Sequence, residues 1–359
     1  MRILLDDGMQ LGVGTGIGNY ARYLGESLAA CPDTEVVRED FAARGSRRAA
    51  RLRYLHYLES AAYREKLSHF DVVHYANYAM PRKTPHGTLT AVTVHDLTAF
   101  SHRDTLPRAY AAYNRAMVRR AVKHADLILT VSNAIREELI ARFPDAAHRT
   151  HAVYPGHYDR ITAGDIPPVY ENKALTGLEN RKFFLFVGTV ERRKNLGTLI
   201  SAFSLLTRVE QRDDLALVLA GRDGFGAEAY HALAARTGAD IRFTGYLSES
   251  DLKKLYREAT AFVFPSIYEG FGSPQTECMS CGLPLLLSDI PTNREISGDY
   301  GAYFPTDDPE ALMLRMRDLL NAPPDRNALR AVGKVRLAPF SWHAAAEQIR
   351  ALYGAHRKN

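Results

Sequence analysis

The stretch that most constrains the fold runs from Ala261 to Asp289, with the sequence AFVFPSIYEGFGSPQTECMSCGLPLLLSD. Its first four residues, Ala261–Phe264, form an apolar, aromatic-rich run, which is the pattern of a buried strand. Ser273 and Pro274 suit the N-cap and the first turn of a helix, and Gly282 can end that helix in the left-handed conformation. The stretch therefore predicts a strand, a glycine-bearing loop, a short helix and a second strand.

Two carboxylates flank the predicted loop. Glu269 precedes it, and Glu277 is expected in the first turn of the helix. The backbone N–H groups of Phe271, Gly272 and Ser273 would lie at the helix N-terminus, where the helix dipole favours anions. This combination suits a ligand with a phosphate group and several hydroxyl groups, such as a sugar nucleotide. Taken separately, each acid is better explained by structure, as a solvated loop residue or a partner of the helix dipole.

The spacing of Glu269 and Glu277, with GFGSP between them and CGLP after them, closely resembles the signature of retaining GT-B glycosyltransferases of family 4. In that family the first glutamate lies by the donor sugar and the second by the nucleotide ribose, which implies those roles here. The resemblance also implies an α/β fold with two Rossmann-like, doubly wound parallel-sheet domains and an interdomain cleft.

Length and composition are compatible with such a fold. A chain of 359 residues is too long for one ordinary core and suits two domains. It contains no apolar run of about eighteen residues and no signal-peptide pattern, so we expect a cytoplasmic protein that could bind the inner face of a membrane. Its formal charge of +5 favours anionic partners. Cys278 and Cys281 form a CxxC pair without a second pair, so core packing is expected rather than a zinc or redox site.

A glycine-rich loop follows the first predicted strand, Ile3–Asp6. Its glycines do not fit G-x-G-x-x-G, so a dinucleotide fingerprint is only weakly supported, and an ordinary turn is the alternative. The sequence GIGNY resembles the N-terminal loop of the family-4 transferases. The resemblance implies that the backbone of Gly16, Ile17 and Gly18 approaches the donor phosphate and the acceptor.

The segment 44–66 is rich in arginine and tyrosine. Such a segment could form a basic amphipathic surface for anionic lipid, although a solvated helix face explains it equally well. A transferase that uses a lipid-linked acceptor would benefit from this surface. The residues considered are Arg44, Arg47, Arg48, Arg51, Arg53, Tyr54, Tyr57 and Leu58.

His95 ends the second of two predicted buried strands, Val72–Ala76 and Thr90–His95. Open α/β sheets bind ligands at the carboxyl ends of their strands, although a lone histidine is usually structural and Asp96 could simply cap the next turn. The sequence TVHDL resembles the family segment whose histidine contacts the donor sugar across the cleft. The resemblance implies this role for His95. Ser132 is expected to be a helix N-cap.

A basic cluster follows the predicted strand Phe183–Val187, in the sequence GTVERRKNL. Such residues are often merely exposed, but Arg193 and Lys194 would face the same anion as the glutamate-flanked loop. ERRKN resembles the family's E-P-R-K-N/G, which implies that these two side chains neutralise the diphosphate. Many members carry arginine directly after the first glycine, where this chain has Thr189, so the individual phosphate contacts stay open.

Gly245, Tyr246 and Leu247 occupy the place where the nucleotide base rests in the family. Tyr246 could stack on the base, with ordinary packing as the alternative. Ser248 and Asp251 predict a capping box for the next helix.

The sequence also predicts the domain limits. A polar, proline-bearing linker is expected at Ile161–Asn180. We expect an N-terminal acceptor-binding domain over 1–165 and a C-terminal donor domain over 178–340. By resemblance to the family, a terminal helix over 341–359 crosses back onto the first domain.

The reaction implied by the resemblance is hexosyl transfer from a nucleotide-diphosphate sugar, with retention and without a metal or another cofactor. His95 and Glu269 are the expected catalytic residues. GTVERRKNL, TVHDL and GIGNY look most like bacterial mannosyltransferases of polysaccharide assembly, which suggests GDP-mannose and a glycan or lipid-linked acceptor, with no nucleic-acid partner. The open alternatives are a UDP-sugar donor, a GT-B nucleotide-sugar epimerase or hydrolase, and a non-catalytic sugar- or lipid-binding module.

Overall fold

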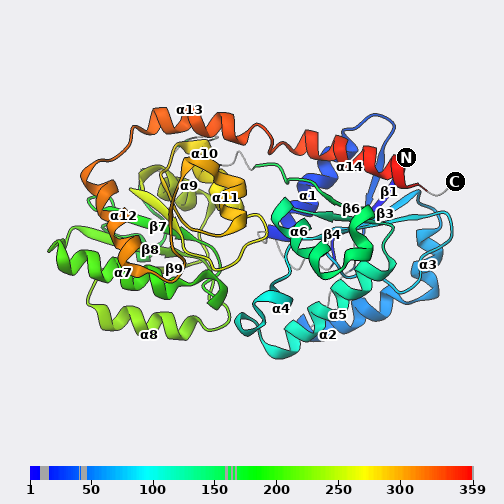
Figure 1. The fold of residues 1–359 in the computed structure, drawn as a ribbon, viewed down its shortest axis with the longest axis horizontal. Coiled ribbons are helices and arrows are strands. Elements are labelled where there is room, and N and C mark those ends of the chain that lie inside the picture. The colour runs from blue at the N-terminus through cyan, green and yellow to red at the C-terminus, as the bar shows by residue number, and fades with distance from the viewer. Residues whose placement is uncertain are drawn as a thin grey trace. The chain divides into compact units, whose positions relative to one another are not determined.

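Two six-stranded parallel sheets form the framework of the chain (Figure 1). The computed structural model describes residues 1–8, 16–39, 41, 47–157, 161–162, 165 and 168–357, without the side chains of residues 47 and 48. The first sheet has the strand order β2-β1-β3-β4-β5-β6, and the second has the order β12-β11-β10-β7-β8-β9. This confirms the predicted α/β class with two Rossmann-like, doubly wound parallel sheets.

The first sheet alternates with helices along the N-terminal half of the chain. Every residue of β4 is buried, as expected for a parallel strand that is covered on both faces. The strands are β1 (Arg2–Asp6), β2 (Glu35–Arg38), β3 (Val72–Tyr75), β4 (Leu89–Val94), β5 (Leu127–Thr130) and β6 (Thr150–Ala152). The helices are α1 (Gly16–Ala29), α2 (Arg47–Leu58), α3 (Ala61–Leu67), α4 (Thr98–Ser101), α5 (Arg108–His124) and α6 (Asn133–Arg142).

The second sheet repeats this alternation. Its strands are β7 (Lys182–Val187), β8 (Leu215–Ala220), β9 (Ile241–Gly245), β10 (Ala261–Phe264), β11 (Leu285–Ser288) and β12 (Gly301–Phe304). Its helices are α7 (Leu196–Val209), α8 (Ala227–Thr237), α9 (Glu249–Glu258), α10 (Ser273–Cys281), α11 (Pro291–Ser297), α12 (Pro309–Asn321) and α13 (Arg326–Leu337). Helices α7, α8 and α12 lie on one side of this sheet, and α9, α10 and α13 lie on the other (Figure 1).

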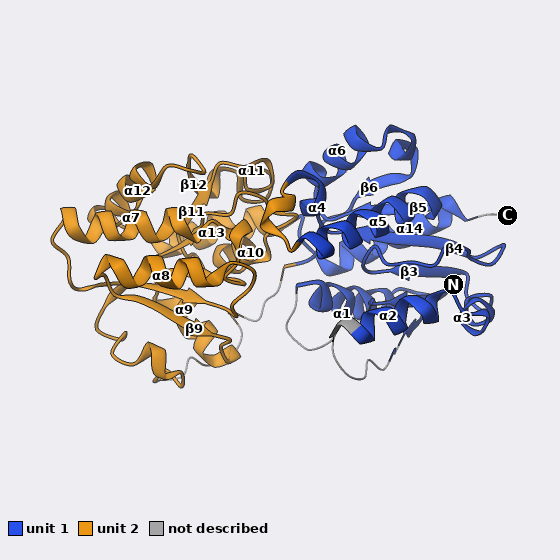
Figure 2. Cartoon of the chain, turned by 90° about the horizontal axis from the view of Figure 1, so that it is seen from below, with its two compact units in different colours: residues 1–101, 108–156, 339–359 blue, residues 102–107, 157–338 orange. Residues whose placement is uncertain are grey.

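The chain divides into two compact units (Figure 2). Unit 1 comprises residues 1–101, 108–156 and 339–359, and unit 2 comprises residues 102–107 and 157–338. Apart from residues 102–107, unit 1 continues to Gly156, whereas the sequence suggested a limit at 165. The segment that follows is tied to unit 2, because Arg257 Nη2 on α9 donates to the Thr162 carbonyl at 3.2 Å. Further along, the Asp251 carboxylate accepts hydrogen bonds from the backbone N–H groups of Glu171 and Asn172 at 2.8 and 3.0 Å.

This use of Asp251 also changes the interpretation of α9. The Ser248 hydroxyl accepts a hydrogen bond from the Asp251 N–H at 3.2 Å, as predicted for an N-cap. The second half of the predicted capping box is wrong, because the Asp251 carboxylate accepts its hydrogen bonds from Glu171 and Asn172, in the segment that precedes α9. At α6 the predicted N-cap is confirmed, since the Ser132 hydroxyl accepts from the Ile135 N–H.

The terminal helix α14 (Trp342–His356) belongs to unit 1. The Tyr353 hydroxyl lies 2.6 Å from His74 Nδ1 on β3, and His74 Nε2 lies 2.8 Å from the Thr93 hydroxyl on β4. Burial lowers the pKa of His74 to about 3, so this imidazole is neutral at physiological pH. A buried polar chain thus fixes α14 to two strands of the first sheet.

The side chains that are exposed on the arginine-rich helix α2 are not all the ones predicted for a lipid-facing surface. Tyr54 and Leu58 are buried and belong to the core, so they were wrongly assigned to a lipid-facing surface. Arg51 and Arg53 lie at least partly outside the core, and Leu52 is 64% exposed. The predicted contribution of Arg44 lies outside the described residues, as do the loop residues 9–15.

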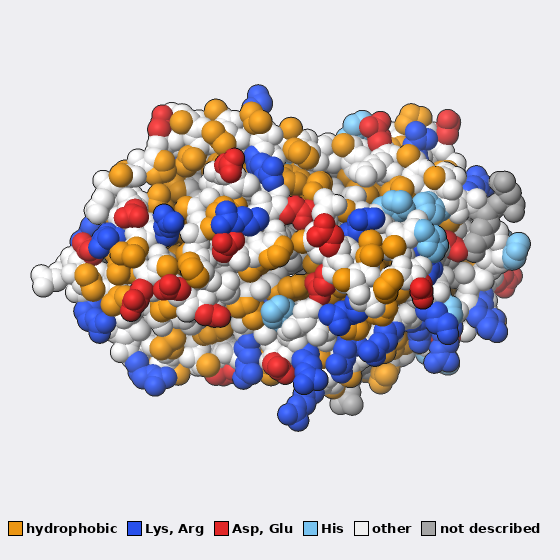
Figure 3. Space-filling model, in the orientation of Figure 1, with side chains coloured by type: hydrophobic (Ala, Val, Ile, Leu, Met, Phe, Trp, Pro, Cys, Tyr) orange, Lys and Arg blue, Asp and Glu red, His pale blue; other side chains and the backbone are white. Residues whose placement is uncertain are grey.

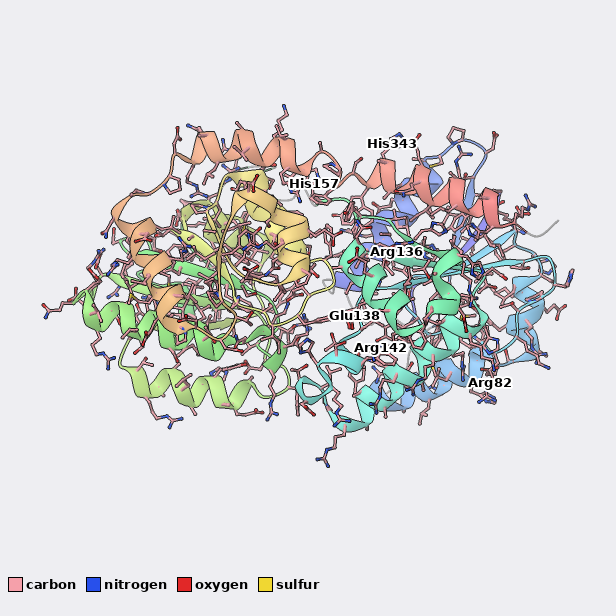
Figure 4. The ribbon with its side chains drawn as sticks, in the orientation of Figure 1. Arg82, Arg136, Glu138, Arg142, His157 and His343 are labelled. Carbon is pink, nitrogen blue, oxygen red and sulfur yellow. The ribbon has the colours of Figure 1, made fainter. Side chains whose placement is uncertain are left out.

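Three further observations concern α6, the cysteines and the membrane. On α6, Arg136 Nε donates to the Thr150 carbonyl at 2.9 Å, and Arg142 lies 3.9 Å from Glu138 (Figure 4). Cys278 and Cys281 are buried free thiols, which confirms the packing interpretation. Within the described part of the chain, no helix is long and apolar enough to cross a membrane.

Candidate functional site

The glutamate-flanked loop and the basic cluster meet at one edge of the second sheet. Strand β10 pairs with β7 in parallel, so the segments that follow both strands leave the sheet at the same edge. The Ile267 N–H donates to the Arg193 carbonyl at 3.0 Å, which joins the two segments directly. Residues separated by about seventy positions in the sequence are therefore neighbours, because the topology places their strands side by side.

Four charged side chains form a compact ion-pair cluster at this edge. Lys194 Nζ lies 2.6 Å from Glu269 Oε1, and Arg193 Nη1 lies 2.9 Å from Glu269 Oε2. Arg193 Nη2 lies 2.9 Å from Glu191 Oε1. The cluster therefore contains two cations and two carboxylates, and its formal charge is zero. Glu191 was missed as a site residue, although it stands in the ERRKN sequence that drew attention to its neighbours.

Burial makes these ion pairs electrostatically strong. Burial alone would raise the pKa of Glu269, but Arg193 and Lys194 outweigh it and lower that pKa to about 2. The pKa of Lys194 is lowered by burial and by Arg193, while Glu269 opposes this change. Lys194 Nζ also lies 4.8 Å from the centre of the Phe264 ring. The interpretation of Glu269 as a solvated loop acid is wrong, because the residue is buried and doubly paired.

Hydrogen bonds to the backbone hold the loop that carries Glu269. The Thr292 hydroxyl donates to the Glu269 carbonyl at 2.7 Å. Arg193 Nη1 donates to the Tyr268 carbonyl at 2.8 Å, in addition to its pairing with the Glu269 carboxylate. The arginine thus contacts both the backbone and a side chain of this loop.

The start of α10 differs by one residue from the prediction. Gly272 is the N-cap, with φ at +79°, and Ser273 is already helical. A side chain at position 272 would be strained and would place a Cβ 2.4 Å from Gln275 Nε2, so this turn requires glycine. Phe271 is buried beside it. At the other end of the helix, Gly282 has φ at +70°, which confirms the predicted left-handed cap.

The sequence had placed Glu277 in the first turn of α10. Because the helix begins at Ser273, Glu277 instead lies beyond that turn. Its side chain is buried, and the Tyr256 hydroxyl donates to Oε2 at 2.5 Å. Tyr256 comes from α9 and is itself fully buried. This tyrosine was not identified from the sequence, because nothing in the local pattern of α9 distinguishes it from a core residue.

The sequence left two interpretations of Tyr246, stacking on a nucleotide base or ordinary packing, and the two side chains that follow β9 differ in exposure. Leu247 is buried, as ordinary packing predicts, but Tyr246 is 58% exposed. The guanidinium carbon of Arg222, which follows β8, lies 4.6 Å from the centre of the Tyr246 ring. Gly245, the last residue of β9, has φ at +67°. An exposed aromatic ring with an arginine over its face suits a planar ligand such as a nucleotide base.

The remaining predicted site residues belong to unit 1. His95 follows β4, and its Nε2 donates to the Ala76 carbonyl at 2.7 Å. Burial lowers the pKa of His95, so the neutral imidazole is favoured with its proton on Nε2. Asp96 accepts from the Thr98 N–H at 3.0 Å and so caps a turn, as its structural interpretation predicted. Gly16–Gly18 form the first turn of α1.

Comparison with known proteins gives the same assignment for both halves of the chain. Residues 14–157 match the family model "Glycosyltransferase Family 4", and residues 171–336 match the model "Glycosyl transferases group 1". The O-antigen chain mannosyltransferase B of Escherichia coli is 30% identical over 282 residues, which is 77% of this chain and 72% of that protein.

Solved structures share the fold over almost the whole chain. Sucrose-phosphate synthase from Thermosynechococcus elongatus has a TM-score of 0.74 at 22% identity, covering 99% of this chain and 98% of its own. Anabaena HepE in complex with UDP-glucose has a TM-score of 0.71 at 17% identity, covering 99% and 100%. With the matching family models and the relative from Escherichia coli, these similarities show that the chain belongs to glycosyltransferase family 4 and has the GT-B fold.

Proposed function

We propose that the chain transfers a mannosyl group from GDP-mannose to a hydroxyl group of a glycan or lipid-linked acceptor, with retention of anomeric configuration. The observation that carries the proposal is the buried cluster of Arg193, Lys194 and Glu269 in a chain that is 30% identical to a mannosyltransferase. In the reaction, the bond between the anomeric carbon and the diphosphate oxygen breaks. The acceptor oxygen bonds to that carbon, and its proton passes to the departing diphosphate.

The cations of the cluster would stabilise the leaving group. Negative charge develops on the diphosphate as the glycosidic bond breaks, and preorganised cations in a poorly solvated site stabilise such charge by several kcal/mol, on the order of three per group. The start of α10, at Phe271, Gly272 and Ser273, adds the favourable end of a helix dipole. Because these groups already supply positive charge, we propose that no metal ion is needed. Addition of a chelator should therefore leave the transfer rate unchanged.

The proposal assigns the remaining donor contacts as follows. Glu269 and His95 position the hexose, Glu277 binds the ribose, and Gly16–Gly18 approach the donor phosphate. The neutral His95 with its proton on Nε2 presents Nδ1 as an acceptor for a sugar hydroxyl group. His95→Ala should therefore lower the transfer rate without preventing the binding of GDP.

Arg222 and Tyr246 support guanine as the base. Arginine can donate two hydrogen bonds to O6 and N7 of guanine, a pattern that uracil does not present. A UDP-sugar is the second candidate, because the structural relative HepE was solved with UDP-glucose. Thermal stabilisation by GDP-mannose, but not by UDP-glucose or UDP-GlcNAc, would support the proposal. Stronger stabilisation by a UDP-sugar than by GDP-mannose would contradict GDP-mannose as the donor and favour the UDP-sugar.

Product analysis separates transfer from the other reactions of this fold. With GDP-mannose and a lipid-linked mannosyl acceptor, a transferase forms a new glycoside, whose anomeric configuration NMR can read. A hydrolase releases free sugar at the same rate with or without the acceptor, and an epimerase returns a changed nucleotide sugar. A non-catalytic binding module does none of these.

We also propose that unit 1 binds an anionic membrane surface through α2 and α5. Arg51 lies 5.1 Å from the ring centres of both Tyr110 and Tyr113, so the two helices share one face. Leu52 and Tyr110 are 64% and 37% exposed there. Basic side chains gather along this lower edge of the unit (Figure 3), where Arg82 also lies (Figure 4). Basic residues around exposed apolar ones suit a headgroup boundary.

Vesicle binding tests this surface. Each basic residue near an anionic membrane contributes about 1 kcal/mol, so reversing Arg51 and Arg53 to glutamate should weaken binding to phosphatidylglycerol vesicles by more than about tenfold. Lys334→Glu, on the exposed face of α13, is the matched control and should change binding little. The proposal would be contradicted if all three proteins bound phosphatidylglycerol vesicles equally. It would also be contradicted if the wild type bound neutral phosphatidylcholine vesicles as tightly as anionic ones.

A further inference from the structure

The charge balance of the ion-pair cluster has a consequence for its ligand. The cations proposed to bind a diphosphate are already paired: Lys194 with Glu269, and Arg193 with both Glu269 and Glu191. Lys194 and Glu269 are each less than one tenth exposed, so water does little to weaken this pairing. A diphosphate that reached the cluster as it stands would bring at least two negative charges next to two carboxylates.

The two carboxylates do not oppose a phosphate equally. Glu269 contacts both cations, one with each carboxylate oxygen, at 2.6 and 2.9 Å. Among the described residues, the Glu191 carboxylate forms an ion pair with Arg193 alone, and it is more exposed than that of Glu269. Glu269 therefore occupies the positions around Lys194 and Arg193 that phosphate oxygens would take. The Glu269 carbonyl accepts a separate hydrogen bond from the Thr292 hydroxyl, so the loop keeps this anchor when the carboxylate leaves the cations.

We propose that Glu269 is an internal competitor of the donor's diphosphate, which displaces its carboxylate from Lys194 and Arg193 and frees it to turn towards the hexose. This inference rests on the function proposed above and adds an order of events. The sugar contact of Glu269 forms only after the phosphates have bound. When the sugar has left, the carboxylate returns to the two cations and favours release of the nucleoside diphosphate.

The exchange predicts an unusual effect of mutation. Glu269→Gln keeps the shape of the side chain but removes the competing charge, so GDP should bind about tenfold more tightly than to the wild type, which corresponds to about 1.4 kcal/mol. A residue that only contacted the donor would give weaker binding when changed. Because Glu269 is ionised well below neutral pH, the gain should be the same at pH 6 and pH 8.

Isothermal titration calorimetry with GDP provides the test. Glu277→Gln is the matched control, because Glu277 is also buried, on α10, but its carboxylate accepts a hydrogen bond from the uncharged Tyr256 hydroxyl. It should bind GDP no more tightly than the wild type. Guanosine, which lacks phosphates, should bind the wild type and Glu269→Gln equally. Glu269→Ala provides a second variant, and circular dichroism shows which variants are folded.

The possible results separate this inference from the proposed function. Tighter binding of GDP by folded Glu269→Gln or Glu269→Ala, but not by Glu277→Gln, supports the competition. Equal or weaker binding by both folded Glu269 variants overturns it while leaving the donor site in place. If the wild type binds none of GDP, UDP and ADP, both the proposed function and the proposed competition by Glu269 are refuted.

Discussion

Loss of one cation from the ion-pair cluster should destabilise unit 2 by a predictable amount. The pKa of Glu269 falls from its ordinary value of 4.5 to about 2, which corresponds to roughly 3 kcal/mol of net stabilisation of its ionised form. The ion pair of Glu269 with Lys194, at 2.6 Å, is shorter than its ion pair with Arg193, at 2.9 Å. Arg193 lowers the pKa of Glu269 through its charge, and Lys194 lowers it through both its charge and its hydrogen bond, so we assign roughly half of that energy to Lys194. Lys194→Met, which keeps an unbranched side chain, should lower the free energy of unfolding by about 2 kcal/mol.

A double-mutant cycle isolates the interaction from the other effects of each change. The cycle compares the wild type, Lys194→Met, Glu269→Gln and the double variant in urea unfolding followed by far-ultraviolet circular dichroism. We expect a coupling energy of about 2 kcal/mol at pH 7. The fluorescence of Trp342, the single tryptophan, reports unit 1 and should change less.

The pH dependence of the coupling provides a further check. The pKa of Glu269 is lower in the folded protein, so its stabilising contribution is complete above pH 4.5 and is lost as the pH falls towards 2. Additivity of the two substitutions within about 0.5 kcal/mol at pH 7 would refute the electrostatic account of the cluster.

Three further predictions concern buried polar groups. Asp6 is buried and accepts from Tyr54 and Tyr63, and burial raises its pKa to about 6. Its ionisation therefore lowers the free energy of unfolding as the pH rises from about 4 to 6. In urea unfolding, the stability of Asp6→Asn relative to the wild type should rise by about 2 kcal/mol between pH 4.5 and 7.5. His74 changes the stability in the opposite direction with pH. Because its pKa is lowered in the folded protein, acidification below pH 6.5 destabilises the fold. His74→Gln should remove about 2 kcal/mol of the wild type's loss between pH 6.5 and 5, and an unchanged pH profile would contradict this. Tyr256→Phe should raise the donor KM severalfold with a smaller change in kcat, since its hydroxyl orients Glu277; equal losses in both would indicate a different role.

The sequence was sufficient for most of the secondary structure because parallel strands buried on both faces leave near-continuous apolar runs. The limits of β10 agree with the predicted Ala261–Phe264, and β7 begins one residue before the predicted Phe183–Val187. Helix starts were harder. At α10 the serine before the proline suited an N-cap, but the glycine before it adopts the left-handed conformation and takes that place. Side-chain chemistry alone cannot choose between two adjacent capping residues.

The candidate site was predicted as a set of residues rather than as an arrangement. Arg193, Lys194 and Glu269 could be chosen by their positions after strands, and the structure brings them together. Their pairing with one another could not be predicted, because sequence spacing does not give the direction of a side chain. Tyr256 was missed for the same reason, since it reaches Glu277 from a different helix.

The release of GDP from GDP-mannose in the presence of a lipid-linked acceptor tests the central claim most directly, when the wild type is compared with Lys194→Ala and the surface control Lys334→Ala. If the cluster stabilises the departing diphosphate, Lys194→Ala should lose on the order of a hundredfold or more of the turnover rate, and Lys334→Ala should match the wild type. Turnover by folded Lys194→Ala at the rate of the wild type would contradict the account.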